Sequence, residues 1–388
     1  MKHPFTVRIL EVLEKHFGRD AENVIKLSPL LGYINFKTRS ANRGAKSRSS
    51  FASLYALYVL TEDYLAQGFD SGKKYSKYDG ADFTPLLRRM RKLPFGQKLQ
   101  NHALNSRTND EFHKFFPEED RRPILRKVDL QKYWINEGLL IIKLSGKNIN
   151  IAKPILEIID LYVATKKESF EQFIRDCETL KSAERSKGQD VTDYIRGLIA
   201  PDRDARIFEI VSYAILRSHF AEEVIFIGAT ARNVKPETLR LFKTGRTNAN
   251  DGGIDFVMKP LGRFFQVTET LDVKKYFLDI DKIEKYPISF VVKTDLAVEE
   301  IRSRLEAGAR EQYTVDSVVA KYMASIEEII NIPRLVEIFG SVIKVGRVGD
   351  VLHEIIKWSK VEFNYFEESD ASAGTVVDDD GEDDPTEN

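Results

Sequence analysis

The second half of the chain alternates short apolar runs with segments whose apolar residues recur at helical spacing. The helical spacing covers Arg206–Phe220, Asp272–Tyr286 and Leu296–Ala309. Four short runs rich in β-branched and aromatic residues predict strands at Val224–Ile227, Gly253–Lys259, Arg263–Glu269 and Ile288–Lys293. The resulting order of helix, three strands, helix, strand and helix predicts a mixed α/β sheet flanked by helices.

The first half of the chain is patterned mainly as helices. Helical spacing is found in Phe5–His16, Phe51–Leu65, Ile155–Lys166 and Ser169–Leu180. A helix over Asp129–Glu137 followed by a hairpin that turns within Ser145–Asn148 would resemble a winged-helix element at residues 129–151. Between Asn35 and Ser50 almost nothing is apolar, so we expect an exposed loop or arm there.

These patterns divide the chain into four segments. We expect a mainly helical N-terminal domain over residues 1–183, a linker over 184–202 and an α/β domain over 203–366. The last segment, residues 367–388, is rich in Asp and Glu without apolar periodicity, which predicts a disordered acidic tail.

The net charge of −1 conceals an uneven distribution along the 388 residues. By formal charge, residues 1–140 sum to +9, residues 141–360 to +1 and residues 361–388 to −11. A basic first third is the electrostatic footprint expected of a polyanion-binding protein, although a solvated basic face would give the same count. The candidate DNA contacts are cations of the exposed arm and of a second loop: Lys37, Arg39, Arg43, Lys46, Arg48, Lys243 and Arg246.

Several classes of protein are disfavoured by what the sequence lacks. It has no Gly-rich phosphate loop, no Cys/His zinc pattern and no Ser-centred nucleophile elbow. His102, Asn105 and His113 lack the spacing and the strand pair of an HNH nuclease. No apolar run is long enough to cross a bilayer, the start lacks a secretory signal, and Cys177 is the single cysteine, so we expect a cytoplasmic protein.

Candidate catalytic residues follow two of the predicted strands and one helix. Asp255 lies after the two glycines of Asn250-Asp-Gly-Gly-Ile-Asp, where a missing side chain lets backbone approach a phosphate. Gln266 follows eleven residues later in the next strand, and Glu209 lies on the preceding helix. Carboxylate and amide oxygens are ligands that Mg²⁺ accepts. Asp255, Glu209 and Gln266 are therefore candidate ligands of Mg²⁺ or another divalent cation, although Asp255 could instead mark a turn and Gln266 a buried amide.

Gly-Gly-Ile-Asp followed by a Gln-bearing strand resembles the PD-(D/E)xK nuclease superfamily, in the branch of type II restriction endonucleases whose motif ends in Gln-x-Lys. The resemblance covers about residues 203–310 and implies an αβββαβ core that hydrolyses phosphodiester bonds of DNA. The chain departs from the motif at Thr268, which stands where the lysine is expected. Lys274 or Lys275 on the next helix, or Lys243, are candidate replacements, and Glu269 is a candidate extra ligand.

The resemblance implies a sequence-specific endonuclease of restriction-modification and phage defence. Its expected partners are double-stranded DNA, a second copy of the chain and a methyltransferase acting on the same site. The helices of Asp316–Ile330 and Val351–Ser359 are candidates for the dimer contact. Two alternatives remain open: a DNA-binding protein that kept the fold but lost hydrolysis with its lysine, and a repair or recombination nuclease that recognises DNA structure.

Overall fold

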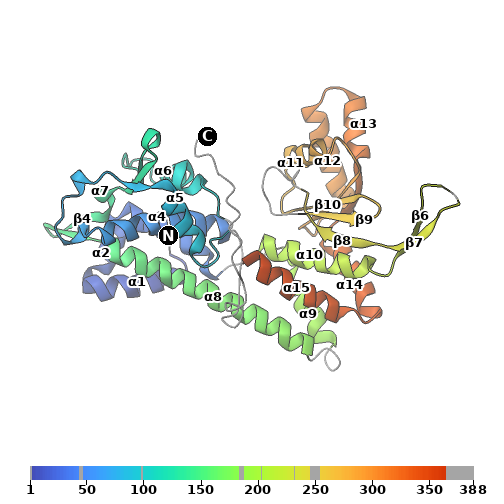
Figure 1. Ribbon diagram of the computed structural model, residues 1–388, viewed down its shortest axis with the longest axis horizontal. Helices are drawn as coiled ribbons and strands as arrows, with labels where there is room; N and C mark the ends of the chain where they lie inside the picture. Colours follow the sequence, from blue (N-terminus) through green and yellow to red (C-terminus); the bar gives the residue numbers. More distant parts are fainter. Residues whose placement is uncertain are drawn as a thin grey trace. The chain divides into compact units, whose positions relative to one another are not determined.

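The computed structural model describes residues 2–42, 47–97, 99–182, 188–201, 203–230, 232–244 and 254–363 (Figure 1). The chain forms two compact units, Met1–Phe173 with Lys360–Asn388, and Ile174–Ser359. The division falls inside one long helix, α8 (Ala152–Ser182). The expected acidic tail, residues 367–388, lies outside the described residues.

The N-terminal unit is mainly helical, as its pattern predicts. Its other helices are α1 (Pro4–Phe17), α2 (Ala21–Leu27), α3 (Pro29–Thr38), α4 (Ser47–Ala66), α5 (Phe83–Lys92), α6 (Thr108–Phe115) and α7 (Glu137–Leu140). They enclose one apolar core that includes Tyr33, Tyr55 and Tyr162. The two helices expected over Ile155–Lys166 and Ser169–Leu180 form one continuous helix, α8. The residues between them, Lys167 and Glu168, are good helix formers, and Lys167 pairs with Glu171 at 3.7 Å.

The helix expected over Asp129–Glu137, as the first part of a winged-helix element, is a wrong prediction. Residues 132–135 are not helical but form β3 (Lys132–Ile135), which lies between β1 (Ala81–Asp82) and β2 (Ile124–Lys127). The side chains of Tyr133 and Ile135 are buried while Lys132 and Trp134 are partly exposed, which is the alternation of a strand. The hairpin is confirmed as β4 (Ile141–Leu144) paired with β5 (Lys147–Asn150).

The C-terminal unit is built on a five-stranded mixed sheet. The strands lie in the order β12-β11-β10-β9-β8. β8, β9 and β10 run antiparallel to one another, whereas β11 is parallel to β10 and β12 parallel to β11. Their bounds are β8 (Arg240–Lys243), β9 (Phe256–Lys259), β10 (Arg263–Thr268), β11 (Ile288–Val292) and β12 (Ile326–Ile330). The mixed α/β class expected from the sequence is therefore confirmed.

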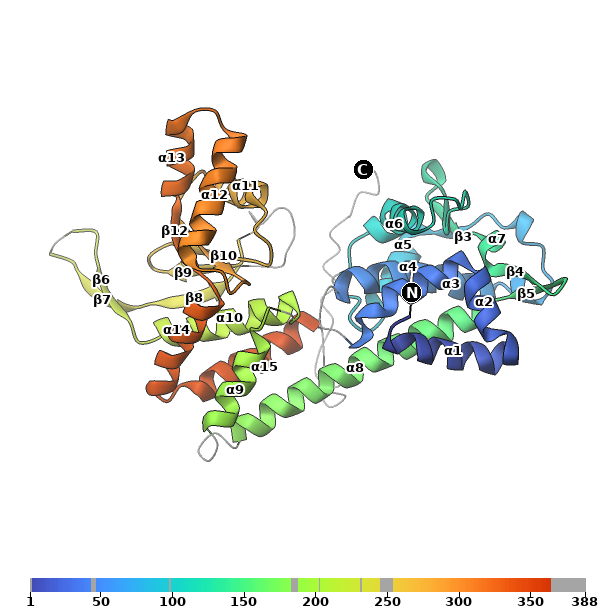
Figure 2. The same ribbon diagram turned by 180° about the vertical axis from the view of Figure 1, so that it is seen from behind.

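Helices cover both faces of this sheet (Figures 1 and 2). On one face lies α10 (Ala205–Phe220), whose Tyr213 packs on Phe256 with ring centroids 5.2 Å apart. On the other face Tyr276 packs on Phe290 at 4.5 Å. The remaining helices of the unit are α9 (Gly188–Leu198), α11 (Val273–Lys282), α12 (Val298–Gln312), α13 (Asp316–Ala324), α14 (Ile332–Lys344) and α15 (Val348–Phe363). Among the helices of the described residues, none has the length and apolar character that crossing a bilayer requires.

Three segments differ from their sequence-based expectation. Residues 188–198, expected within a linker, form α9 with Val191 and Ile195 buried. The expected helix over Asp316–Ile330 ends at Ala324 and continues as the strand β12. The run Val224–Ile227 is a strand, β6, but it is exposed and pairs with β7 (Lys235–Thr238) in a separate hairpin. The first strand of the sheet is instead β8, which the pattern did not reveal.

Candidate functional site

Asp255 lies directly before β9, where its backbone and side chain are both held by β10. Its backbone N–H donates to the Phe265 carbonyl at 3.2 Å, and its Oδ2 accepts from the Val267 N–H at 2.7 Å. Burial raises the pKa of Asp255 to about 7, and the nearby Glu209 carboxylate contributes in the same direction. A divalent metal ion bound to this carboxyl group would replace its proton and stabilise the ionised form.

Glu209 lies on α10, which begins at its N-cap Asp204. Its Oε1 is 2.8 Å from the ammonium of Lys243, and its Oε2 is 2.5 Å from the guanidinium of Arg206. Burial alone would raise the pKa of Glu209, but Lys243 and Arg206 together hold it below its ordinary value. Asp255 and Glu209 therefore differ in ionisation: both cations contact Glu209 directly, whereas at Asp255 burial outweighs the influence of the same two cations.

Lys243 ends β8 with its side chain turned toward α10 rather than toward solvent. The side chain is 11% exposed, and its ammonium lies over the rings of Tyr213, Phe256 and Trp358 at 6.0, 5.9 and 5.5 Å. Such rings favour a cation through their negative faces. Lys243, predicted from the sequence both as a replacement lysine and as a DNA contact, lies beside Glu209 and Asp255.

Gln266, in β10, has an amide oxygen that no hydrogen bond satisfies within the described part of the chain. The residue is 6% exposed, so this oxygen is out of contact with bulk solvent. An unsatisfied buried carbonyl oxygen costs roughly 1–3 kcal/mol and is therefore unusual. Because the Asp255 N–H donates to the neighbouring Phe265 carbonyl, Gln266 lies beside Asp255 in the sheet.

The other expected catalytic residues lie at the same end of β10 or on the next helix. The Thr268 hydroxyl is buried and donates to the Thr270 carbonyl at 3.0 Å. Glu269 pairs with Lys293 at 3.2 Å, and Lys293 also donates to the Arg203 carbonyl. Lys274 is exposed on the first turn of α11, where its backbone N–H is capped by Asp272. Among the described residues, no hydrogen bond or ion pair joins Lys274 to Asp255.

Two cations of this region were missed by sequence reasoning. Arg206 stands one helical turn before Glu209, a spacing that would have predicted the ion pair. Lys293 directly follows the apolar strand β11, and a lysine that follows a buried strand is a signal for a site at the strand end. Within the described residues, no three or more His, Cys, Asp or Glu side chains gather as a metal-binding group. A metal site here would therefore need an amide oxygen as well.

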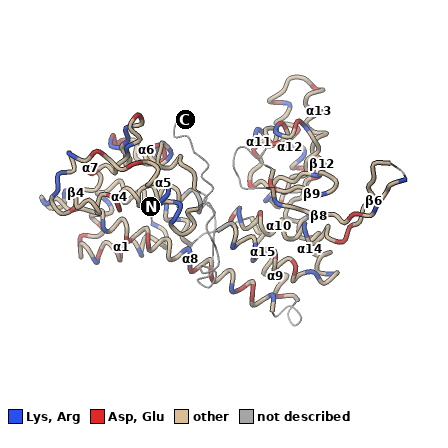
Figure 3. The backbone as a smooth tube through the Cα atoms, in the orientation of Figure 1, with Lys and Arg blue, Asp and Glu red and all other residues tan. Residues whose placement is uncertain are grey.

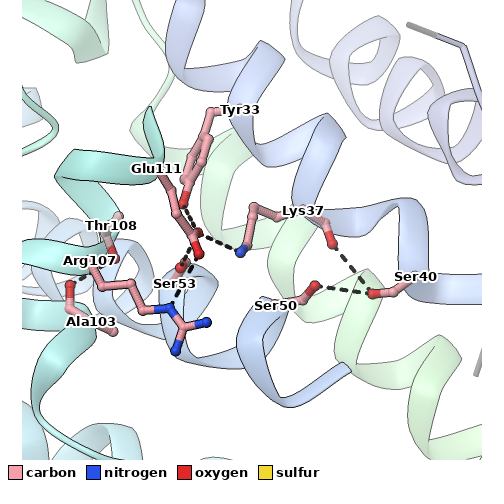
Figure 4. Close-up of polar contacts among 9 residues, drawn as sticks. All are labelled: Tyr33, Lys37, Ser40, Ser50, Ser53, Ala103, Arg107, Thr108 and Glu111. Carbon is pink, nitrogen blue, oxygen red and sulfur yellow. Dashed lines mark hydrogen bonds and ion pairs between the residues drawn. The ribbon is translucent and has the colours of Figure 1, made fainter. Parts of the chain in front are cut away.

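The expected basic arm is wrong where the structure describes it. Residues 29–38 form α3, and Lys37 is buried, with its ammonium 2.7 Å from Glu111 Oε2. Glu111 also accepts from Tyr33 at 2.9 Å, Ser53 at 3.1 Å and Arg107 at 3.2 Å (Figure 4). These donors come from α3, α4 and the helical segment Ala103–Arg107, and they converge on one carboxylate of α6. Lys37 is thus part of the interior and not an exposed DNA contact.

The ionisation of this cluster follows from its burial and its neighbours. Burial opposes the charged form of Glu111, but Lys37, Tyr33 and Arg107 outweigh it and lower the pKa of Glu111. Burial lowers the pKa of Lys37 and raises that of the Tyr33 hydroxyl. The cluster is an ion pair supported by neutral donors, which ties α3, α4 and α6 together.

The remaining expected DNA contacts are described only in part. Arg39 is exposed in the short 3₁₀ turn Arg39–Asn42. Arg43, Lys46 and Arg246 lie outside the described residues, as does the segment 245–253 before Asp255, and the side chain of Arg48 is not described. Basic and acidic positions are interspersed over the N-terminal unit (Figure 3).

Comparison with protein-family models, with curated proteins and with solved structures finds no match to this chain.

Proposed function

We propose that the chain is a divalent-metal-dependent deoxyribonuclease that cuts double-stranded DNA at a specific sequence, in the manner of type II restriction endonucleases. The observation that carries the proposal is the gathering of Asp255, Gln266, Glu209 and Lys243 where β8 ends, β9 begins and β10 runs past. The elements of the five-stranded sheet and its helices support it: with the separate hairpin of β6 and β7 set aside, their order α10-β8-β9-β10-α11-β11 corresponds to the αβββαβ order of the PD-(D/E)xK nuclease core.

Asp255 and Gln266 fit a magnesium ion. The buried, unsatisfied Oε1 of Gln266 and the carboxylate of Asp255 are hard oxygen donors on neighbouring strands. A divalent ion bound there would polarise a phosphoryl oxygen and lower the pKa of the attacking water. The Val267 N–H donates a hydrogen bond to Asp255 Oδ2 at 2.7 Å, which restricts rotation of the carboxylate.

Lys243 is the residue that we assign to the place of the missing motif lysine. Thr268 stands at the motif position and cannot carry a positive charge. Lys243 and Arg206 both lie beside the two acids, and we assign the role to Lys243 because it ends β8 next to the start of β9 and contacts Glu209 at 2.8 Å. Because both Glu209 oxygens are engaged by cations, we assign Glu209 the positioning of Lys243, and its direct contact with a metal would require one ion pair to open.

The expected partners and location are part of the same proposal. A sequence-specific nuclease of this kind would act in the cytoplasm with a methyltransferase that protects the same site, and would bind duplex DNA as a homodimer. The single cysteine, Cys177, is buried, which suits a reducing compartment. Arg39 is the exposed cation that we keep as a DNA contact.

The substrate class can be tested by offering several DNAs with Mg²⁺. Discrete fragments from a long unmethylated duplex support the proposed sequence-specific enzyme. Cleavage restricted to junctions or flaps would instead identify a structure-specific nuclease of repair or recombination. Binding without cleavage under Mg²⁺, Mn²⁺ and Co²⁺ would identify a DNA-binding protein without hydrolytic activity.

A further inference from the structure

The hairpin of β6 and β7 stands clear of the rest of its unit in both views (Figures 1 and 2). It is inserted between α10, which carries Glu209, and β8, which carries Lys243. Its four residue pairs run from Val224 opposite Thr238 to Ile227 opposite Lys235. At its base the Leu239 N–H donates to the Glu223 carbonyl at 2.8 Å. The hairpin is thus a separate two-stranded sheet with a defined register.

Large apolar side chains of this hairpin are exposed. Phe226 is 73% exposed and Val224 51%, and Ile227 and Val234 are also exposed. A two-stranded hairpin on its own is marginally stable in water and gains from further strands or from packing. Exposed apolar surface of this kind marks an interaction site.

The two outer edges of the hairpin differ in a way that indicates which one pairs. β7 reads Lys-Pro-Glu-Thr, and a lysine or a proline on an edge strand discourages the addition of another strand. β6 reads Val-Ile-Phe-Ile, without a charge or a proline. An edge with this composition is the template on which a further β-strand assembles. The β6 edge is open to pairing and the β7 edge is protected from it.

We propose that β6 pairs antiparallel with β6 of a second copy of this chain. The two hairpins then form a four-stranded sheet about a two-fold axis, with the strand order β7-β6-β6-β7. Two copies of β6 can pair with each other without unfavourable contacts, because all four residues of the strand are apolar and uncharged. Val224, Phe226 and Ile227 of both copies gain apolar neighbours on association.

A nucleic acid is the less suitable occupant of this hairpin. Residues 222–238 contain Glu222, Glu223 and Glu237 against Arg232 and Lys235. Affinity for DNA comes largely from cations that neutralise phosphates, and β6 itself has none. The helix α15, expected as a dimer contact, has Val351, Leu352 and Ile355 buried inside its own unit, so these side chains are not available to a partner.

Sedimentation equilibrium of the full chain without DNA tests the pairing independently of any nuclease activity. We expect a concentration-dependent dimer whose dissociation constant Phe226→Lys raises more than about tenfold. Glu237→Lys, on the protected strand, should leave that constant unchanged. Thermal unfolding of both variants at low concentration should match the wild type, because both side chains are exposed.

Cross-linking gives a second, positional readout. A short bismaleimide should join two copies of Phe226→Cys, with the buried Cys177 as a low background. It should not join two copies of Glu237→Cys, whose strands would be about 14 Å apart at an interstrand spacing of about 4.8 Å. A chain that is monomeric at all concentrations, or a dimer that Phe226→Lys leaves intact, overturns the proposal. If the wild type is itself monomeric and Phe226→Lys still loses DNA binding, the hairpin would instead be assigned to DNA contact.

Discussion

The Lys243 ammonium lies 2.8 Å from Glu209 Oε1, so an ion pair joins the last residue of β8 to the middle of α10. Both side chains are nearly enclosed, with 11% and 12% of their surface exposed. Arg206 contacts the other oxygen of Glu209, which leaves the three groups with a net charge of +1 beside Asp255. The excess positive charge suits a site that receives a phosphate.

Replacing Lys243 should reduce both stability and activity. Lys243→Met leaves Glu209 with Arg206 alone, and breaking a buried pair costs about 3–5 kcal/mol. We expect a loss near the lower end of that range in urea unfolding, together with loss of DNA cleavage. Adding Glu209→Gln to Lys243→Met should recover part of the stability. Lys259→Met, which alters an exposed lysine of β9, should change neither property, and equal effects of both methionine variants would contradict the assignment.

The raised pKa of Asp255 predicts a stability that depends on pH. The pKa is about 7 in the folded chain and 3.8 in its ordinary state, so the folded state binds the proton more tightly between these values. Stability without metal should therefore fall as the pH rises from about 4 to 7, by up to about 4 kcal/mol. Asp255→Asn should lack this fall and be the more stable protein at pH 8. If the free energy of unfolding in urea depended on pH in the same way for both proteins, Asp255 would not be the cause of that dependence.

Lys37 should matter for stability and not for DNA binding. Lys37→Met leaves the buried Glu111 without its ammonium, and we expect a loss of about 3 kcal/mol in the free energy of unfolding. The salt dependence of DNA affinity should stay the same, because the side chain does not reach solvent. Arg39→Met should leave stability within about 0.5 kcal/mol and lower the salt slope by about one. A lower salt slope with Lys37→Met and a loss of stability with Arg39→Met would instead support the exposed basic arm.

Two glycines in helices should respond to alanine with opposite signs. A Cβ on Gly308 of α12 would lie 2.6 Å from Val273 Cγ2, and valine has little freedom to move away. Gly308→Ala should therefore cost about 1–3 kcal/mol. A Cβ on Gly340 of α14 meets nothing within 4 Å, so Gly340→Ala should stabilise by about 0.5–1 kcal/mol. Thermal unfolding of the two variants measures both, and a stabilised Gly308→Ala would contradict the packing of α11 on α12.

The sequence was informative where local signals agree with one another. β10 and β11 were predicted to within one residue at each end, and the cap Asp272 marks the start of α11, but α11 ends at Lys282 and not at Tyr286 before Pro287. Asp255, Gln266 and Glu209 are candidate site residues from the sequence alone. Their proximity could not be derived from the sequence, since it depends on the pairing of β9 with β10 and on the packing of α10.

The errors arose where long-range contacts decide the outcome. Lys37 has the polar neighbours of an exposed loop, but its partner Glu111 lies 74 residues away in the chain. The run Val224–Ile227 has the composition of a buried strand, and only its separation from the sheet makes it exposed. β8 was missed because two of its four residues are cations, one of which is buried by its contact with Glu209.

The most direct test of the metal site is Mg²⁺-dependent cleavage of duplex DNA by three proteins at equal concentration. The wild type should cut, and Asp255→Asn should lose cleavage by at least about two orders of magnitude while remaining folded. Asp272→Asn makes the same change at an exposed N-cap, where asparagine is equally suitable, and should cut like the wild type. Unimpaired cleavage by Asp255→Asn, or no cleavage by the wild type with any divalent ion, would contradict the account.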